Sequence, residues 1–377
     1  MSAPRASAEE RERLLADFVR LCEIESPSGR ERAMADAVSA ELRALGLEVE
    51  EDGSRGETGS DAGNLLARLP GPDGARTILL CAHLDTVPLD GPVEVVRENG
   101  AFRNRHEAIL GADNKAAVAT ILAAARRLVR EGSPVGVELL FTTSEELALR
   151  GAQAFETGTL RSEFGFVFDH ASPVGELIVA APTYYRLDAR FRGTAAHAGI
   201  RPEVGRNAIF AGARAISAMR LGRLDGETTA NVGRIEGGTA SNVVAERCRV
   251  ELEARSLDET KAGETVAAMV DACSEAATDA DCDVETSVER QFQGYRLSRS
   301  SPPVVTAAGA LEALGIEPVY RPTGGGSDAN AFVAAGLTVL NVANGTEHNH
   351  QPDESVTAEA LEAVLDLTLG IVARSAQ

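Results

Sequence analysis

Four apolar runs of strand length, separated by other segments, most constrain the fold of this chain. They read NLLARL, TILLCAH, VELLFTT and FGFVFD, at residues 64–69, 77–83, 137–143 and 164–169. An alanine-rich helical segment, residues 114–132, separates the second run from the third. Continuous apolar strands that alternate with helices are typical of a mostly parallel sheet with helices on both faces. We therefore predict an α/β fold with such a sheet.

The pattern changes near residue 184, where apolar and polar residues begin to alternate. YRLDARFRG at 185–193 and RCRVELEARS at 247–256 have a period of two, which is typical of antiparallel strands with one exposed face. Two amphipathic segments, 203–220 and 260–277, predict helices beside these strands. The sequence thus predicts a smaller α+β module of four antiparallel strands and two helices on one face.

Helix and strand segments of the first kind resume after this module. We therefore predict that the smaller module is inserted in the larger one. The boundaries that we predict are 1–182 and 293–377 for the larger domain and 183–292 for the inserted domain. A length of 377 residues agrees with two domains of ordinary size.

Charge and composition exclude several classes of function. A formal net charge of −20 argues against nucleic acid or an anionic membrane as partner, because clustered Lys and Arg hold phosphate groups. No stretch approaches the roughly 18 apolar residues of a membrane span, and the N-terminus lacks an apolar signal segment. The cysteines are odd in number and have no paired spacing, as in a reducing compartment. We expect a cytoplasmic protein that binds small ligands or peptides.

Carboxylates and histidines follow the points where the predicted strands end. The carboxyl ends of parallel strands meet at one edge of a sheet, where ligands bind in open α/β folds. The residues concerned are His83, Asp85, Asp113, Glu145, Glu146, Asp169, His348 and His350. So many carboxylates in one place repel one another unless a cation lies among them, and the sequence therefore predicts a metal site.

Each of these residues taken alone has a simpler interpretation. A single His83 at a strand end is more often structural, and Asp113 alone makes a good helix N-cap. Together they fit better as ligands, since carboxylates with histidines and no thiolates suit zinc, manganese or cobalt in a hydrolytic site. Two metals that share a bridging carboxylate need about five protein ligands, which this set supplies. His83 is then a ligand, and Asp85 orients its imidazole.

Eight segments occur in an order that resembles one enzyme family. They are CAHLDTVP, GADNKAAVA, TTSEELALRGA, VFDH, GTAAHAG, GGTASNVV, TGGGSDANAF and HNHQPDES. From about residue 60 to 356 the chain resembles the di-zinc metallopeptidases related to peptidase T, glutamate carboxypeptidase, acetylornithine deacetylase and succinyl-diaminopimelate desuccinylase. The segment GGGSDAN makes the peptidase T branch the most similar. The resemblance implies a catalytic domain of the zinc exopeptidase type with an inserted lid.

The resemblance also implies a ligand set for two zinc ions. His83 and Asp169 would hold one ion. Glu146 and His350 would hold the other, and Asp113 would bridge the two. Manganese or cobalt could replace zinc with these ligands.

Two further assignments follow from the resemblance. Glu145 would be the general base, which takes a proton from the attacking water and returns it to the leaving amine. The ligand histidine of relatives stands four residues before a glutamate, here Glu354, and this spacing selects His350 over His348.

The inserted module resembles a lid that closes over the substrate and often dimerises. His197 matches the histidine that stabilises the oxyanion of the tetrahedral intermediate, commonly across a dimer. Asn242 and Arg255 match a substrate-binding pair, in which the guanidinium suits a substrate carboxylate. The other candidates for substrate contacts are Asn207, Gly325 and Ser327. We therefore expect a homodimer that forms through the lid.

Three functions remain open at this stage. The first is a metal-dependent aminopeptidase that acts on short peptides. The second is a deacylase of N-acyl amino acids, or a carboxypeptidase, with the same metal centre. The third is a non-catalytic, metal-dependent binding protein that keeps the fold. Glu145 argues against the third, because a binding protein needs no base beside the ligand Glu146.

Overall fold

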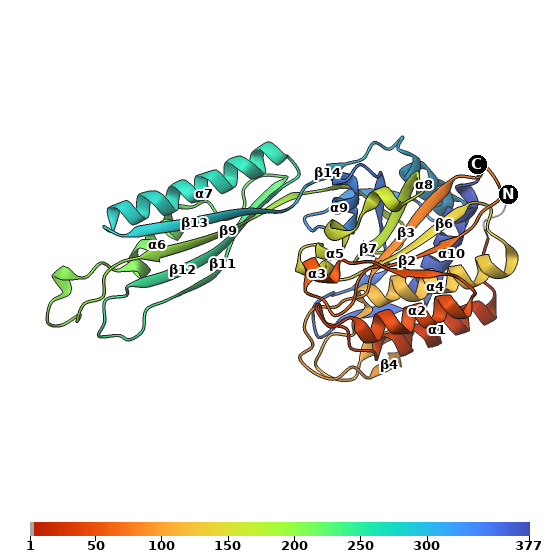
Figure 1. Ribbon diagram of the computed structural model, residues 1–377, viewed down its shortest axis with the longest axis horizontal. Coiled ribbons are helices and arrows are strands. Elements are labelled where there is room, and N and C mark those ends of the chain that lie inside the picture. Colours follow the sequence, from red (N-terminus) through yellow and green to blue (C-terminus); the bar gives the residue numbers. More distant parts are fainter. Residues whose placement is uncertain (1–3) are drawn as a thin grey trace. The chain divides into compact units, whose positions relative to one another are not determined.

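The chain folds into two compact units, which Figure 1 shows in a computed structural model that describes residues 4–377. The larger unit comprises the chain up to Ala180 together with Arg296–Gln377. The smaller unit, Ala181–Tyr295, is inserted between these two parts of the sequence. No helix within residues 4–377 is both long and apolar enough to cross a membrane.

The main sheet has nine strands among the described residues, in the order β1-β2-β6-β3-β7-β16-β8-β14, with β15 paired to β8. They are β1 (Val49–Glu51), β2 (Leu65–Leu69), β3 (Thr77–His83), β6 (Gly136–Thr142), β7 (Phe164–His170), β8 (Glu176–Ala181), β14 (Tyr295–Arg296), β15 (Val319–Pro322) and β16 (Val339–Ala343). The central strands β6, β3, β7 and β16 are parallel, whereas β1 and β2 pair antiparallel at one edge. The predicted mostly parallel mixed sheet is confirmed.

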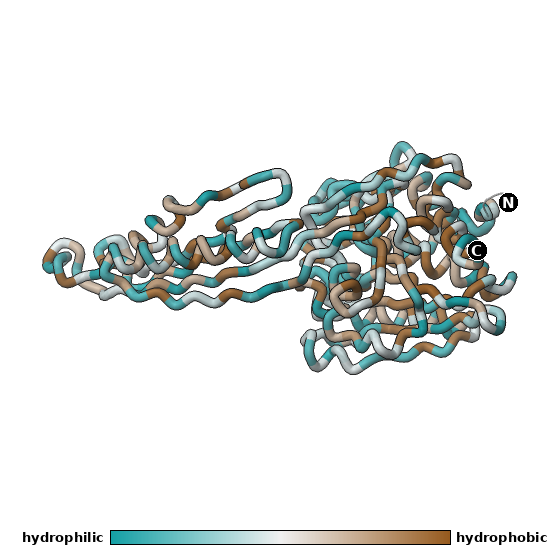
Figure 2. The backbone as a smooth tube through the Cα atoms, turned by 90° about the horizontal axis from the view of Figure 1, so that it is seen from above, coloured by the Kyte–Doolittle hydropathy of each residue, from teal (hydrophilic) through white to brown (hydrophobic). Residues whose placement is uncertain are grey.

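Helices flank this sheet (Figure 1). They are α1 (Ala8–Cys22), α2 (Arg32–Ala44), α3 (Arg55–Thr58), α4 (Ala112–Glu131), α5 (Arg150–Ala154), α8 (Pro302–Leu314), α9 (Asp328–Ala334) and α10 (Ala358–Arg374). The alanine-rich α4 is buried along most of its length, because small side chains allow it to lie close to β3 and β7. Every residue of β6 and all but the first residue of β3 are buried, and Figure 2 shows hydrophobic stretches running through the larger unit.

A second, four-stranded sheet brings distant parts of the chain together. It consists of β17 (Thr346–Glu347), β18 (Ser355–Thr357), β5 (Ala101–Asn104) and β4 (Val95–Glu98) in that order. β17 and β18 pair with each other and enclose the segment that contains His350. The sequence patterns did not predict this sheet.

The smaller unit contains an antiparallel sheet in the order β10-β11-β12-β9-β13. Its elements are β9 (Thr183–Arg192), α6 (Ala208–Ala218), β10 (Gly222–Arg223), β11 (Thr228–Gly237), β12 (Arg247–Ser256), α7 (Glu259–Asp279) and β13 (Asp283–Phe292). Apolar side chains such as Leu187, Phe191 and Leu252 pack with those of both helices in one core. The predicted four long strands and two helices are confirmed, and the short strand β10 is an addition.

Candidate metal centre

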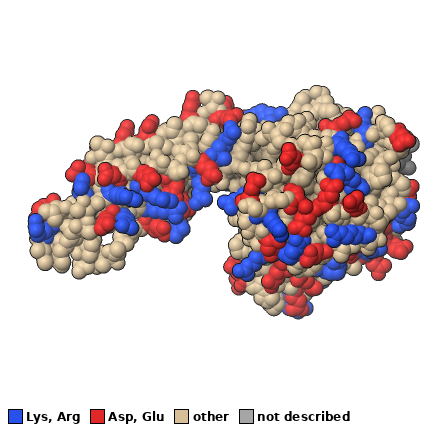
Figure 3. Space-filling view, viewed as in Figure 1, with Lys and Arg blue, Asp and Glu red and all other residues tan. Residues whose placement is uncertain are grey.

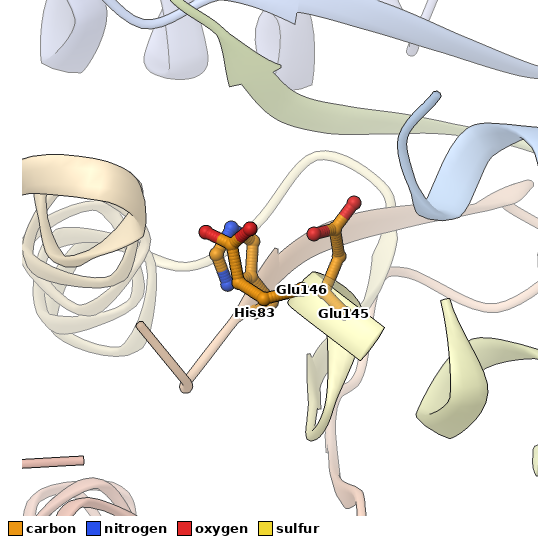
Figure 4. Close-up of side chains that lie close together, drawn as sticks. All are labelled: His83, Glu145 and Glu146. Atoms are coloured by element: carbon orange, nitrogen blue, oxygen red, sulfur yellow. The ribbon is translucent and has the colours of Figure 1, made fainter. Parts of the chain in front are cut away.

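The carboxyl ends of the central strands position most of the predicted polar cluster. His83 is the last residue of β3 and pairs in register with Thr142, the last residue of β6. Glu145 and Glu146 follow β6 in a short 3-10 helix, η1 (Glu145–Leu147), and Asp169 lies near the end of β7. Figure 4 shows that the two glutamates and the His83 ring project to the same side.

Five side chains form two groups of possible metal ligands that share Asp113. In the first group, His83 Nε2 lies 3.3 Å from Asp113 Oδ1 and 3.6 Å from Asp169 Oδ1. In the second, His350 Nε2 lies 3.3 Å from Asp113 Oδ2 and 2.9 Å from Glu146 Oε1. The two oxygens of Asp113 therefore face different groups, as a carboxylate between two cations requires.

The donor atoms of this cluster fit metal ions. His83 Nε2 and Asp113 Oδ1 are both buried, and neither has a hydrogen-bond partner within the described part of the chain. Leaving a buried polar atom without a partner costs about 1–3 kcal/mol, and a cation between these two atoms would satisfy both. Histidine nitrogens and carboxylate oxygens without thiolates suit zinc, manganese or cobalt.

Glu145 lies close to the same cluster but has different neighbours from Glu146. A third group of possible ligands contains His83, Glu145 and Glu146. His350 makes its contact with Glu146, however, and no contact between His350 and Glu145 is found among the described residues. This geometry favours Glu146 as the ligand and leaves the buried Glu145 carboxylate for another role.

Asp85 is fully buried and ties η1 to the end of β3. Its carboxylate accepts hydrogen bonds from the backbone N–H groups of Glu145 (3.0 Å) and Glu146 (3.2 Å) and from the Ser28 hydroxyl (2.7 Å). His83 Nδ1 lies 3.0 Å from the Asp85 carbonyl oxygen and 3.4 Å from its Oδ1. When a cation replaces the proton on Nε2, an Nδ1–H directed at Asp85 would leave the Nε2 lone pair for that cation.

Glu354 holds the loop that leads into Asp113. Its Oε2 accepts hydrogen bonds from the N–H groups of Leu110 (2.8 Å) and Gly111 (2.7 Å), and its Oε1 accepts one from Asp113 (2.9 Å). Gly111 has a φ of 73°, in the left-handed region that favours glycine. Burial raises the pKa of Glu354 to about 7 despite these bonds. The sequence pattern identified Glu354 only as a spacing marker and missed this role.

The two histidines of HNHQPDES have different surroundings. His350 contacts Asp113 and Glu146, and hydrogen bonds with these two carboxylates raise the pKa of His350 to about 10. His348 is exposed, and its Nδ1 lies 2.7 Å from Asp353 Oδ2. Only His350 of this pair lies in a possible ligand group of the described residues.

Burial acts to raise the pKa of every carboxylate of the cluster, but at one of them the neighbouring histidines reverse the shift. Burial raises the pKa of Glu145 well above its usual value, and the charge of Asp169 adds to this. Burial also acts to raise the pKa of Asp113, but the close imidazoles of His350 and His83 outweigh it and lower this pKa. The positive charges of the protonated histidines thus compensate the negative charge of Asp113. Bound metal cations would replace those protons.

Asp328, the first residue of α9, is a buried carboxylate that the sequence analysis did not identify. Its Oδ2 accepts a hydrogen bond from Thr142 Oγ1 (2.5 Å), whereas Oδ1 has no partner among residues 4–377. Burial raises the pKa of Asp328 to about 7. Thr142 is the last residue of β6 and lies beside His83. By binding Thr142, Asp328 holds the end of β6 in place, and the turn that carries Glu145 follows directly after it.

Two of the proposed substrate contacts already have roles at helix starts. Asn207 is the N-cap of α6, and its Oδ1 accepts a hydrogen bond from the Phe210 N–H (3.1 Å). Ser327 is the N-cap of α9, and its N–H donates to Asn330 Oδ1 (3.2 Å). The third, Gly325, donates its N–H to Thr323 Oγ1 (3.1 Å).

The remaining candidates lie in the smaller unit. The N–H of Ala198, which follows the exposed His197, donates to the Asn242 carbonyl (2.9 Å), so the two candidate residues lie on adjoining loops. The Arg255 guanidinium is paired with Glu253 and lies over the Tyr184 ring, 4.2 Å from its centroid. These contacts orient the Arg255 guanidinium.

Comparison with known proteins gives consistent matches over almost the entire chain. The model of peptidase family M20/M25/M40 matches residues 79–374. The uncharacterized protein YqjE of Bacillus subtilis is 36% identical over 366 residues, which cover 97% of this chain and 99% of that protein. The crystal structure of aminopeptidase PepT from Bacillus cereus has a TM-score of 0.88 at 36% identity, covering 97% of this chain and 99% of that one. A tripeptidase from Staphylococcus aureus has a TM-score of 0.92 at 30% identity, covering 97% and 98%.

We expect Asp328→Asn to change how stability depends on pH. The pKa of Asp328 is about 7 in the folded chain and about 3.9 when unfolded. The folded state holds this proton more tightly than the unfolded state does. The contribution of the protonated carboxyl to the free energy of unfolding is therefore fully present below about pH 4 and is lost as the pH rises to about 7. Asparagine does not ionise, so the free energy of unfolding of the variant should rise relative to wild type by up to about 4 kcal/mol across this window.

The measurement is urea unfolding of both proteins in the presence of a chelator, repeated at several pH values. A difference in unfolding free energy that stays constant between pH 4 and 7 would contradict the titration of Asp328.

Proposed function

Because the chain belongs to peptidase family M20/M25/M40, we propose that it is an aminopeptidase that hydrolyses short peptides with two zinc ions. The observation that carries this proposal is the position of Asp113 between His83 and His350, with one oxygen toward each. That position supports a bridged dinuclear centre. Similarity to the Bacillus cereus aminopeptidase and the Staphylococcus aureus tripeptidase supports short peptides as substrates. Manganese or cobalt would fit the same donors.

Glu145 is the general base of the proposed reaction. Two metal ions at the five ligands would supply Lewis-acid activation of water and of the scissile carbonyl. The Glu145 carboxylate takes the proton of the attacking water, whose oxygen bonds to the carbonyl carbon. As the C–N bond breaks, Glu145 gives that proton to the leaving amine. Burial and the charge of Asp169 raise the pKa of Glu145, which suits a group that holds a proton between two steps.

Residues of the smaller unit make the proposed substrate contacts. His197 donates a hydrogen bond to the oxyanion of the tetrahedral intermediate, and Asn242 and Arg255 bind the peptide. Arg255 is paired with Glu253, so a substrate carboxylate would exchange with that partner. The backbone amides at Gly325, in the larger unit, are a further contact.

We also propose that two copies of the chain associate through the smaller unit. The side chains of Ile200, Val204 and Phe210 are 71%, 46% and 54% exposed, although all three are large and apolar. Ile200 and Val204 follow His197 closely in sequence, so this apolar surface adjoins the proposed catalytic loop. The five cysteines are unpaired in the structure, which supports a cytoplasmic location.

The proposal is tested with one tripeptide in three forms: free, N-acetylated and C-terminally amidated. We expect the zinc-loaded protein to hydrolyse the free and amidated forms but not the acetylated form. If Arg255 holds the substrate carboxylate, KM should be higher for the amidated form. Hydrolysis that requires the acyl group would instead identify a deacylase, and a strict requirement for the free carboxylate would identify a carboxypeptidase.

Substitution of Glu145 and Asp113 should separate catalysis from metal binding. We expect Glu145→Ala to retain both metal ions and to lose at least about 100-fold in kcat, because proton transfer is lost. Asp113→Ala should lose metal, because the bridge is removed. Elemental analysis and tripeptide hydrolysis check both outcomes, with the exposed Glu347→Ala as the matched control. Equal metal loss in the Glu145 and Asp113 variants would contradict the assigned roles.

His197→Ala should lower kcat much more than it changes KM, since an oxyanion contact acts mainly in the transition state. The loss in kcat that we expect is on the order of 100-fold or more. Steady-state kinetics with the free tripeptide measure both constants, and the exposed His106→Ala serves as the control. An effect on KM alone would rule out the oxyanion role.

A further inference from the structure

Four arginines gather on the face of the smaller unit's sheet that lies opposite its core. They are Arg190 and Arg192 on β9 and Arg247 and Arg249 on β12, at positions that alternate with buried residues such as Phe191 and Val250. Arg192 lies directly opposite Arg247 in the register of the two strands, and Arg190 lies opposite Arg249. The arginines therefore form two consecutive like-charged pairs. Figure 3 shows basic side chains side by side on this unit, bordered by acidic ones.

Like charges placed directly opposite each other destabilise a sheet. At the inner pair, Asp188 offsets this repulsion, because it accepts hydrogen bonds from Arg190 Nε (3.0 Å) and Arg249 Nε (2.7 Å). Asp188 leaves the terminal nitrogens of Arg190 available.

The outer pair has much weaker compensation. Arg247 Nε lies 3.6 Å from Glu246 Oε1, and the Arg247 side chain is 82% exposed. Arg192 has no ion-pair partner within the described chain, and Asp283, its neighbour in register on β13, does not form one. Two guanidinium groups thus face the same space without a carboxylate between them.

A cavity of about 910 Å³ opens at these arginines. Gly237 at the end of β11 and Gly238 and Thr239 in the loop after it form another wall, and the acidic lining residues are Glu236 and Glu246. The volume lies in the range of about 300–1,000 Å³ that is usual for small-molecule sites, and exceeds what a single phosphate or carboxylate group fills. Phe191 is the one aromatic residue among those that line it, and Phe191 is 1% exposed, so stacking of a flat ring is not favoured.

We propose that this cavity binds a small molecule with two anionic groups, either phosphates or carboxylates. A guanidinium donates paired N–H groups to either kind of anion, so one group would bind between Arg192 and Arg247. Residues two positions apart on a strand lie about 7 Å apart, and the second group would therefore reach Arg190 at about this distance. Binding here does not depend on the proposed peptidase reaction.

The test is isothermal titration calorimetry of the full chain with two probes, fructose 1,6-bisphosphate for phosphates and adipate for carboxylates. We expect saturable binding of at least one probe, and the probe that binds identifies the anionic group. The variant Arg192→Ala/Arg247→Ala should bind at least about tenfold more weakly, which is about 1.4 kcal/mol. The control variant Arg220→Ala/Arg223→Ala removes two exposed arginines of the same unit outside the cavity and should bind as wild type does.

Absence of saturable binding by both probes would overturn the proposal, and so would equal weakening in the two variants, since that would indicate a general effect of charge. Thermal unfolding provides a second readout: the bound probe should raise the Tm of wild type but not of the cavity variant. If the alanine variant does not fold, Arg192→Gln/Arg247→Gln replaces it, because glutamine keeps part of the side-chain packing.

Discussion

The Asp113 carboxylate lies between His83 and His350, and much of the larger unit serves to keep it there. A buried carboxylate is stable only when charge and hydrogen bonds compensate its loss of water. Here the two imidazoles supply that compensation from opposite sides. Because the histidines come from β3 and from the segment between β17 and β18, Asp113 links the central sheet to the small second sheet.

Buried carboxylates at this sheet edge fall into two kinds, according to what their oxygens face. Asp113 and Asp169 face the donor atoms of the cluster, and cations suit that arrangement. Asp85 and Glu354 instead accept backbone N–H groups, and so hold η1 and the start of α4 in fixed positions. Asp328 similarly holds the end of β6 through Thr142. These supporting groups thus keep the possible ligands in position, and a dinuclear site would require this because errors of a fraction of an ångström weaken metal binding.

The sequence identified the residues of the possible metal-ligand cluster more readily than the groups that support them. His83 and Asp169 were visible because they follow long apolar runs, and the ends of parallel strands must meet at one edge. Glu354 and Asp328 were missed because their partners lie 241 and 186 residues away, among backbone N–H groups and one hydroxyl that have no pattern in the sequence. The second sheet was missed because its strands are two to four residues long. Alternation predicted half-exposed antiparallel strands in the smaller unit, but not the strand register that places Arg192 opposite Arg247.

The cluster that would cleave the amide bond does not by itself select a substrate. The same ligands and base serve an aminopeptidase, a deacylase or a carboxypeptidase, because all three cleave an amide. Selection must therefore come from groups that recognise the ends of the substrate. If Arg255 is such a group, as proposed, it is ready before the substrate binds. Glu253 and Tyr184 already fix its guanidinium, so little side-chain entropy remains to be lost. The charge of Arg255 is also already compensated by Glu253. A substrate carboxylate would therefore gain only the difference in free energy between two ion pairs. Such an arrangement would add little to the affinity for the substrate, but it would still distinguish a free carboxylate from an uncharged chain end.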